Sequence, residues 1–177
     1  MMVHPSDIPA TRQFSISMAV SMTIADVMKE YFDGVSIKWP NDIYWNDRKL
    51  CGILIEHQLS GTFIRQSIIG VGLNVNQTVF TSDAPNPVSM CQIVGYELDC
   101  QEVLQKILER FSLEDIDADR YRTLLYRKNG FYTYCDTEGQ FEAELVTVED
   151  DGHLLLRDRD GRQRRYAFKE VAFLIEN

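Results

Sequence analysis

Two long β-type runs joined by one tight turn constrain this chain more than any other feature. Residues 50–58 and 63–74 are rich in branched apolar residues, and Ser60-Gly61-Thr62 between them is typical of a turn. Strands joined by so short a turn pair antiparallel. Two shorter runs and a second turn precede them, and no βαβ pattern is present, so we predict an antiparallel sheet. Its predicted strands are 35–39, 43–45, 50–58 and 63–74, with turns at 46–49 and 60–62.

The segment before these strands has the periodicity of a buried helix. Ile16, Val20 and Ile24 recur every four residues and form one apolar stripe. Methionines form a second row, which we interpret as core filling rather than a binding stripe. Gly34 is a typical helix stop. We therefore predict a helix over Thr11–Phe32.

The second half of the chain contains helical patterns and then short β-type runs. Ser89 predicts the start of a short helix, and Asp99 followed by Glu102 predicts another, with helical patterns to about residue 128. The β-type runs that follow predict a small barrel packed on the preceding part. We predict an α+β protein with domains over residues 1–129 and 130–177. The strands predicted in the second domain are 131–135, 141–148, 153–157, 164–168 and 171–175.

Charge and composition exclude several classes of protein. The chain has 18 Lys and Arg against 27 Asp and Glu, a net charge of −9, whereas nucleic-acid binders carry a basic face. No run approaches the roughly 20 apolar residues of a membrane span, and the first residues lack the features of a signal peptide. The spacing of the cysteines fits neither a zinc site nor a disulfide framework. We interpret Cys51, Cys91, Cys100 and Cys135 as reduced, mostly buried thiols of a cytoplasmic protein with no metal site.

The segment Lys38-Trp39-Pro40-Asn41-Asp42 breaks a strand and immediately presents an amide and a carboxylate. Lys38 and Lys49 flank these groups. Two ammonium groups beside a carboxylate suit a phosphorylated ligand, and Asp42 could hold Mg²⁺ or orient a lysine. The alternative is an ordinary surface turn with two solvated lysines.

A glycine-rich stretch inside the last strand is a second candidate site. Gly70, Gly72, Asn74 and Asn76 alternate along Gly70–Asn76, so in a strand they share one face and leave a bare strip of backbone. Such a strip suits a ligand lying against the sheet, and an asparagine amide matches an adenine edge. Gly52 in the neighbouring run could face the same groove. A bulge or close strand packing is the alternative.

The stretches KWPNDIYWNDRKLCGILIE (Lys38–Glu56) and IIGVGLNVNQ (Ile68–Gln77) closely resemble the biotin–protein ligases. The segment Asp83–Met90 and the small C-terminal barrel also resemble this family. The resemblance implies a catalytic core like that of class II aminoacyl-tRNA synthetases, followed by an SH3-like barrel. It also implies a two-step reaction. Biotin and ATP with Mg²⁺ give biotinyl-5′-adenylate, and a lysine of a biotin carboxyl carrier protein then displaces AMP.

The resemblance assigns roles to single positions. Lys49 matches the lysine that contacts the biotin carboxylate and the adenylate phosphate, and Asp42 the aspartate that helps the acceptor lysine react. Gly52 and Ile53 match the wall along the biotin chain. The positions assigned to ATP or the adenylate are Lys38, Asn41, Gly70, Gly72 and Asn74.

The chain departs from the family pattern in one respect. The glycine- and arginine-rich loop of the family, resembling G-R-G-R-x-x-R-x-W, is not in this sequence, and Gly161–Arg165 is better interpreted as a charged strand edge. We therefore expect a ligase chain that is incomplete for biotin binding, with a homodimer left open. A non-catalytic remnant that binds a nucleotide or a partner is the alternative, and a lipoate ligase ranks below both.

Overall fold

The computed structural model describes residues 1–5, 7–81, 86–114 and 116–175. The first part of the chain contains β1 (Met2–Val3), the 3₁₀ helix η1 (Ala10–Arg12), α1 (Phe14–Met28), β2 (Val35–Lys38), β3 (Asp42–Trp45), β4 (Arg48–Ser60) and β5 (Phe63–Leu73). The middle contains α2 (Met90–Val94), α3 (Cys100–Arg110) and α4 (Ala118–Thr123). The last part contains β6 (Phe131–Asp136), β7 (Gly139–Val148), β8 (Leu154–Asp158), β9 (Gln163–Tyr166) and β10 (Ala172–Phe173).

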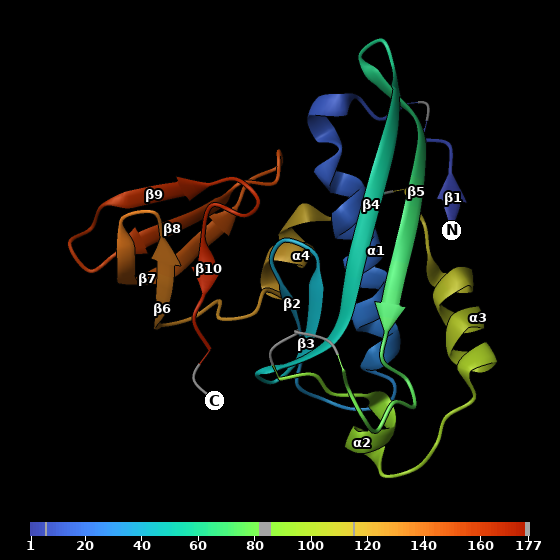
Figure 1. Cartoon of the computed structure of the whole chain (residues 1–177). Coiled ribbons are helices and arrows are strands. Elements are labelled where there is room, and N and C mark those ends of the chain that lie inside the picture. Colours follow the sequence, from blue (N-terminus) through green and yellow to red (C-terminus); the bar gives the residue numbers. More distant parts are fainter. Residues whose placement is uncertain (6, 82–85, 115, 176–177) are drawn as a thin grey trace.

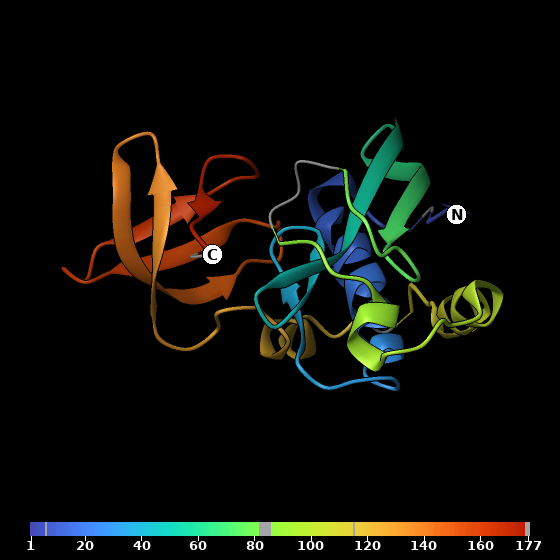
Figure 2. The same cartoon turned by 60° about the horizontal axis from the view of Figure 1, so that its bottom comes forward.

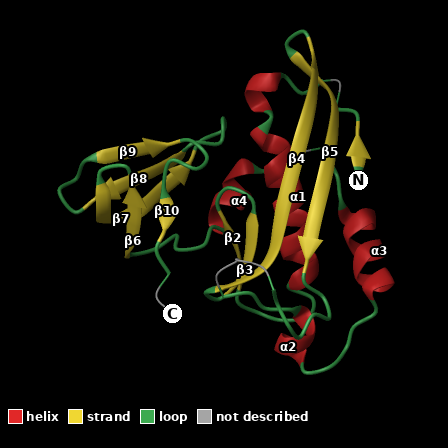
Figure 3. Cartoon of the chain, viewed as in Figure 1, coloured by secondary structure: helices red, strands yellow, loops and turns green. Residues whose placement is uncertain are grey.

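These strands form two antiparallel sheets, so the predicted α+β class is confirmed. The first sheet has the order β1-β5-β4-β3-β2 and the second the order β10-β6-β7-β8-β9. The second sheet lies beside β2 and α4, on the side away from β5 and α3 (Figures 1 and 2). Helix α1 covers one face of the first sheet, and none of the helices in the described part of the chain covers the opposite face of β4 and β5 (Figure 3).

Helix α1 forms where the apolar periodicity predicted it, but it is shorter than Thr11–Phe32. Most of its side chains are buried, and Ile16 and Ile24 are fully enclosed. Its first turn is replaced by η1, which follows Pro9, and Lys29 beyond its last turn is exposed. A helix is stabilised mainly by burying an apolar face, so it ends where that face ends.

The hairpin of β4 and β5 is longer than predicted. β4 begins at Arg48 because the preceding turn needs only two residues, with Asn46 at φ 50°. Lys49 therefore belongs to the strand rather than to the turn. Beyond Gly52 the described part of β4 pairs along its length only with β5.

Both predicted helix starts, at Ser89 and Asp99, are present, but the capping box occurs at Ser89 rather than at Asp99. The Asp99 side chain accepts hydrogen bonds from the backbone N–H groups of Gln101 and Glu102. The reciprocal capping pair lies one helix earlier, where the Gln92 side chain accepts from the Ser89 N–H. Glu102 instead pairs with Lys106 along the helix surface.

All five predicted strands of the second sheet form. β6 to β9 pair in sequence order, and β10 returns to pair with β6. Tyr134, Phe141, Tyr166 and Phe173 pack on one another inside this sheet. Whether this unit is an SH3-like barrel and an independent domain over residues 130–177 stays a prediction.

The turn between β7 and β8 attaches the second sheet to the first part of the chain. The Trp39 indole N–H donates to the Gly152 carbonyl at 2.8 Å. Arg122 of α4 donates to the Val148 carbonyl at 2.9 Å and pairs with Asp150 at 2.6 Å. These contacts, together with a core shared by both sheets, hold the two sheets against each other.

The four cysteines are free thiols, as predicted, but only Cys51 and Cys91 are buried. Cys135 is half-buried and Cys100 is exposed at the start of α3. Within the described residues, no helix is both long and apolar enough to cross a membrane.

Gly152 tests the docking of the second sheet. Its φ is 93°, and a Cβ there would lie 2.8 Å from the Phe14 ring. Gly161 has a similar φ of 84° with open space around it. Backbone strain alone predicts that Gly161→Ala costs about 1 kcal/mol, whereas the added clash predicts about 3 kcal/mol for Gly152→Ala. Urea unfolding of both variants measures the difference, and equal losses would show that the turn is not docked on α1.

Candidate active site

The candidate site is a row of residues that crosses four strands. Lys38 of β2 lies opposite Asp42 of β3, Asp42 lies opposite Gly52 of β4, and Gly52 lies opposite Gly72 of β5. Directly opposite residues in an antiparallel sheet point to the same face. The register therefore places two charged side chains and two bare backbone positions side by side on one face.

Lys49 and Asp42 form the polar centre of this row. The Lys49 Nζ lies 2.7 Å from the Asp42 Oδ1, and 27% and 16% of the two side chains are exposed. A Cβ built on Gly52 would lie 3.5 Å from Asp42 Oδ1 and 3.5 Å from Lys49 Cε. Gly52 therefore leaves the space directly beside the ion pair open.

The loop after β5 holds the backbone of Lys49. The Lys49 N–H donates to the Asn86 carbonyl, and the Lys49 carbonyl accepts from the Val88 N–H. This contact extends the sheet where β5 has ended. The sequence resemblance included Asp83–Met90; residues 83–85 of that segment lie outside the described residues.

The glycine strip exists as predicted. A Cβ on Gly72 would meet only the Gly52 carbonyl, and one on Gly70 only the Leu54 carbonyl, each at 3.7 Å. Both glycines are exposed. Close strand packing, the alternative explanation for them, is wrong because no described side chain lies against the strip. Gly52 faces the same groove and lies opposite Gly72 rather than Gly70.

The asparagines following the strip have structural partners. β5 ends at Leu73, so neither Asn74 nor Asn76 continues the strip as the alternation predicted. Asn76 donates to the Leu98 carbonyl and accepts from the Leu98 N–H, which uses both functions of its amide. Asn74 donates to the Val88 carbonyl at 3.1 Å, and no described residue donates to its side-chain oxygen.

Asn41 and Ile53 lock the end of β2 to β4. The Asn41 side chain donates to the Ile53 carbonyl at 2.6 Å, and the Ile53 N–H donates to the Asn41 carbonyl at 2.8 Å. The Ile53 side chain is buried on the opposite face from Gly52, so only its backbone borders the strip. The structure thus does not bring the Ile53 side chain to the groove beside Gly52.

Lys38 is the second cation of the row, and its environment differs from that of Lys49. Its ammonium group lies 4.7 Å from the centre of the Phe173 ring and 5.3 Å from that of Tyr44. Burial lowers the pKa of Lys38; Asp42 opposes this shift, and Lys49 and Arg127 add to it. Neither Phe173 nor Arg127 carried a sequence signal, because both come from distant segments.

Comparison with known proteins identifies the family that the first part of the chain resembles. Residues 2–74 match the biotin/lipoate A/B protein ligase family. The chain is 29% identical to the bifunctional ligase/repressor BirA of Bacillus subtilis over 91% of its own length and 54% of that protein. It is 27% identical to the biotin–[acetyl-CoA-carboxylase] ligase of Paracoccus denitrificans over 73% of its length and 59% of that protein.

The same relationship is present in three dimensions. The fold superposes on the biotin protein ligase of Aquifex aeolicus, whose structure is a complex with biotin and ATP, with a TM-score of 0.75. The match covers 99% of this chain and 77% of the other at 21% identity. Over residues 2–74 the chain matches the biotin/lipoate protein ligase family, and the curated relatives it resembles are biotin–protein ligases. The chain spans about half the length of the curated relatives it matches.

A cavity of about 410 Å³ lies between the two sheets and is separate from the lysine pair. Its walls are mostly apolar and include Phe14, Trp39, Pro40, Ile53 and Phe168. It does not reach Lys49 or Asp42. Of the polar side chains of the family motif, Asn41 lines this cavity, whereas the charged groups of Lys38, Asp42 and Lys49 do not.

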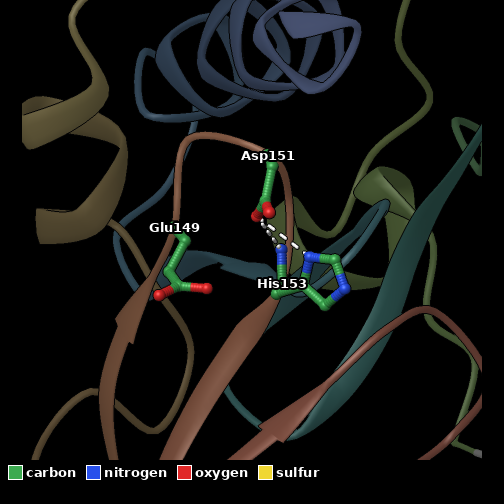
Figure 4. Close-up of side chains that lie close together, drawn as sticks. All are labelled: Glu149, Asp151 and His153. Atoms are coloured by element: carbon green, nitrogen blue, oxygen red, sulfur yellow. Dashed lines mark hydrogen bonds and ion pairs between the residues drawn. The ribbon is translucent and has the colours of Figure 1, made fainter. Parts of the chain in front are cut away.

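A second polar group, which the sequence did not reveal, lies on the β7–β8 turn. Ligand atoms of Glu149, Asp151 and His153 lie within 4.8 Å of one another (Figure 4). Arg165 pairs with Glu149 and with Asp151, each at 2.6 Å. A guanidinium group thus already balances both carboxylates, and we assign no metal to this cluster.

The contrast between two lysines tests the electrostatics of the site. Burial lowers the pKa of Lys38, whereas the nearby Tyr31 hydroxyl and the Glu102 and Glu30 carboxylates, to which the Lys106 ammonium group donates, raise the pKa of Lys106. As pH rises, Lys38 should lose its proton before Lys106. An NMR titration of ¹³C-methylated lysines, with Lys38→Gln and Lys106→Gln for assignment, measures the order. Titration of Lys38 at or above Lys106 would contradict the half-buried position.

Proposed function

We propose that this chain carries the ATP- and phosphate-handling part of a biotin–protein ligase. In the proposed reaction a carboxylate oxygen of biotin attacks the α-phosphorus of ATP, pyrophosphate leaves, and biotinyl-5′-adenylate forms. The amine of a carrier-protein lysine then attacks the carbonyl carbon of the adenylate, and AMP leaves. The fold match to the ligase of Aquifex aeolicus and the family match over residues 2–74 support this proposal.

The observation that carries the proposal is the placement of the ion pair beside the bare strip. Gly52 and Gly72 leave backbone exposed directly next to Lys49 and Asp42. A flat group can lie on such backbone because no side chain rises from it. A phosphate attached to that group would then meet the Lys49 ammonium group. A surface turn with two solvated lysines would not place them on one face of a sheet.

Lys49 is proposed as the residue that balances charge during adenylation. Negative charge accumulates on the phosphate oxygens as the carboxylate approaches, and a fixed cation at that point stabilises it. Asp42 holds the ammonium group in place at 2.7 Å before substrate arrives. In the second step the same carboxylate is proposed to accept a proton from the attacking amine.

The remaining family positions are proposed to bind the nucleotide. Gly70 and Gly72 form the floor, the free side-chain oxygen of Asn74 faces the adenine amino group, and Lys38 adds positive charge. Asn41 acts through the backbone of Ile53 rather than by direct contact, because its amide is already bonded there. The donor set offers Mg²⁺ one carboxylate, which is already paired with Lys49, so the ion enters as Mg·ATP, held by the phosphates.

The finer assignments follow from the same family match. We propose a class II synthetase-like core, an SH3-like second unit over residues 130–177, and a biotin carboxyl carrier protein as macromolecular substrate. A cytoplasmic location and a homodimer stay predictions. The first test is biotinyl-adenylate formation by the full chain with biotin, ATP and Mg²⁺, detected by mass spectrometry.

Two outcomes of that test separate the candidate functions. Adenylate above the level of a Lys49→Ala control identifies a working active site and contradicts the expected incompleteness for biotin binding. Nucleotide binding without adenylate favours a chain that retains only the nucleotide part. That outcome has a physical basis, since reactive adenylates must be shielded from water and the strip is exposed on the described surface.

Lys49→Ala should slow adenylate formation by at least about tenfold, because it removes the cation at the phosphoryl centre. Lys169→Ala provides the matched control, since Lys169 lies in the turn between β9 and β10, with its ammonium group 5.3 Å from the centre of the Phe168 ring. Single-turnover kinetics on both variants measure the effect. A rate within twofold of the unmodified chain for Lys49→Ala would remove the residue from its proposed role.

Gly72→Val should abolish nucleotide binding while the sheet stays folded. The Cβ would make only an ordinary contact with the Gly52 carbonyl, at 3.7 Å, and valine suits a strand, so the free energy of unfolding should change by about 1 kcal/mol or less. Val71→Ile adds bulk one residue earlier, on the opposite face, and serves as control. Calorimetric titration with Mg·ATP gives the affinities. Unchanged ATP affinity in Gly72→Val would show that the nucleotide does not lie on the strip.

A further inference from the structure

The charged row does not end at the edge of the first sheet. Its last member, Lys38, has the Phe173 ring of β10 within 4.7 Å of its ammonium group. Phe173 is itself held by Tyr134 at 4.9 Å and Tyr126 at 6.4 Å between ring centres. A residue of the second sheet thus provides part of the surroundings of a residue in the proposed nucleotide site.

The next residue in the segment is also held by the second sheet. The Trp39 side chain is almost fully buried, and its indole N–H donates to the Gly152 carbonyl at 2.8 Å. Pro40 follows, and then Asn41 bonds to Ile53 in both directions. Residues 38 and 39 are thus fixed from one side by β10 and the β7–β8 turn, and residue 41 from the other side by β4.

We propose that the second sheet is a positioning element of the active site, in which Phe173 holds Lys38 and Gly152 holds Trp39, so that Asn41 and Asp42, between β2 and the start of β3, are kept in a fixed position. Phe173 is a positioning residue, since it acts through Lys38. This role goes beyond the proposed ligase reaction, and only its kinetic consequence rests on that reaction.

The charges around Lys38 explain why such a support is needed. Lys49 and Arg127 both repel its ammonium group, and Asp42 is already paired with Lys49. None of the described residues forms an ion pair with Lys38 within 4 Å. The face of an aromatic ring attracts a cation without adding a competing negative charge. Phe173 can therefore hold Lys38 while leaving its charge available to an anionic ligand.

Hydrogen exchange at the Ile53 amide tests the proposal without any substrate. This N–H donates to the Asn41 carbonyl, so its exchange rate reports how firmly the segment is held. Phe173→Leu should speed exchange at Ile53 about fivefold, and Phe173→Tyr, which keeps the ring, should restore it. Phe131→Leu is the matched control, because it removes a ring that lies under Arg159 elsewhere in the same sheet.

Equal exchange at Ile53 in Phe173→Leu and the unmodified chain would overturn the proposal, as would an equal increase in Phe131→Leu. If Phe173→Leu unfolds the second sheet, Trp39→Phe provides the second test, because it removes the N–H that bonds Gly152. Unchanged exchange at Ile53 in that variant would also overturn the proposal.

A kinetic measurement separates this inference from the ligase proposal. In an active protein, Phe173→Leu should raise KM for ATP at least about threefold with a smaller change in kcat, since it disturbs a binding cation. Faster exchange at Ile53 in a chain that forms no adenylate would support the positioning role while the proposed reaction fails. An unchanged KM in an active protein would overturn the inference.

Discussion

The register between β3, β4 and β5 is the constraint on which the rest of the site depends. Because side chains alternate along a strand, a slip of one residue in β4 would turn Gly52 inward and place Ile53 beside Asp42. The buried face prevents that slip, since Cys51 and Ile53 are enclosed against α1 while Leu54 stays two-thirds exposed. Core packing on one face thus aligns the charged residues and glycines on the other.

The ion pair at the centre of the row is not explained by stability. Exposed or half-exposed pairs contribute about 0–1 kcal/mol to folding, and burying part of Lys38 is unfavourable. Glycines at positions 70 and 72 also weaken a strand. The fold therefore places on one face three features that contribute little to its stability or lower it: the ion pair, the partly buried Lys38 and the two glycines. Such local conflicts are expected where a sequence serves a ligand rather than its own core, which agrees with the match of residues 2–74 to a ligase family.

Much of the fold and part of the site follow from local patterns. The helix stripe, the hairpins and the strands of the second sheet each depend on neighbouring residues, and all formed near their predicted positions. The strip of Gly70 and Gly72 followed from simple alternation. That reasoning failed at Asn76, because nothing local shows that β5 ends at Leu73 and that the asparagine bonds Leu98.

The contacts that sequence patterns missed all join segments distant along the chain. Asn86 and Val88 bond the backbone of Lys49, Trp39 bonds Gly152 across 113 positions, and Phe173 reaches Lys38 from the end of the chain. No local sequence pattern at any of these residues indicates which residue it contacts. These distant contacts also differ from the strand pairing that aligns the row itself. The row is aligned by pairing between adjacent strands, whereas its ends are held by a loop and by a second sheet. A site assembled in this way can keep its register while one support is loosened, so the effect of losing a support should appear first in ligand affinity and local hydrogen exchange, and only later in global stability.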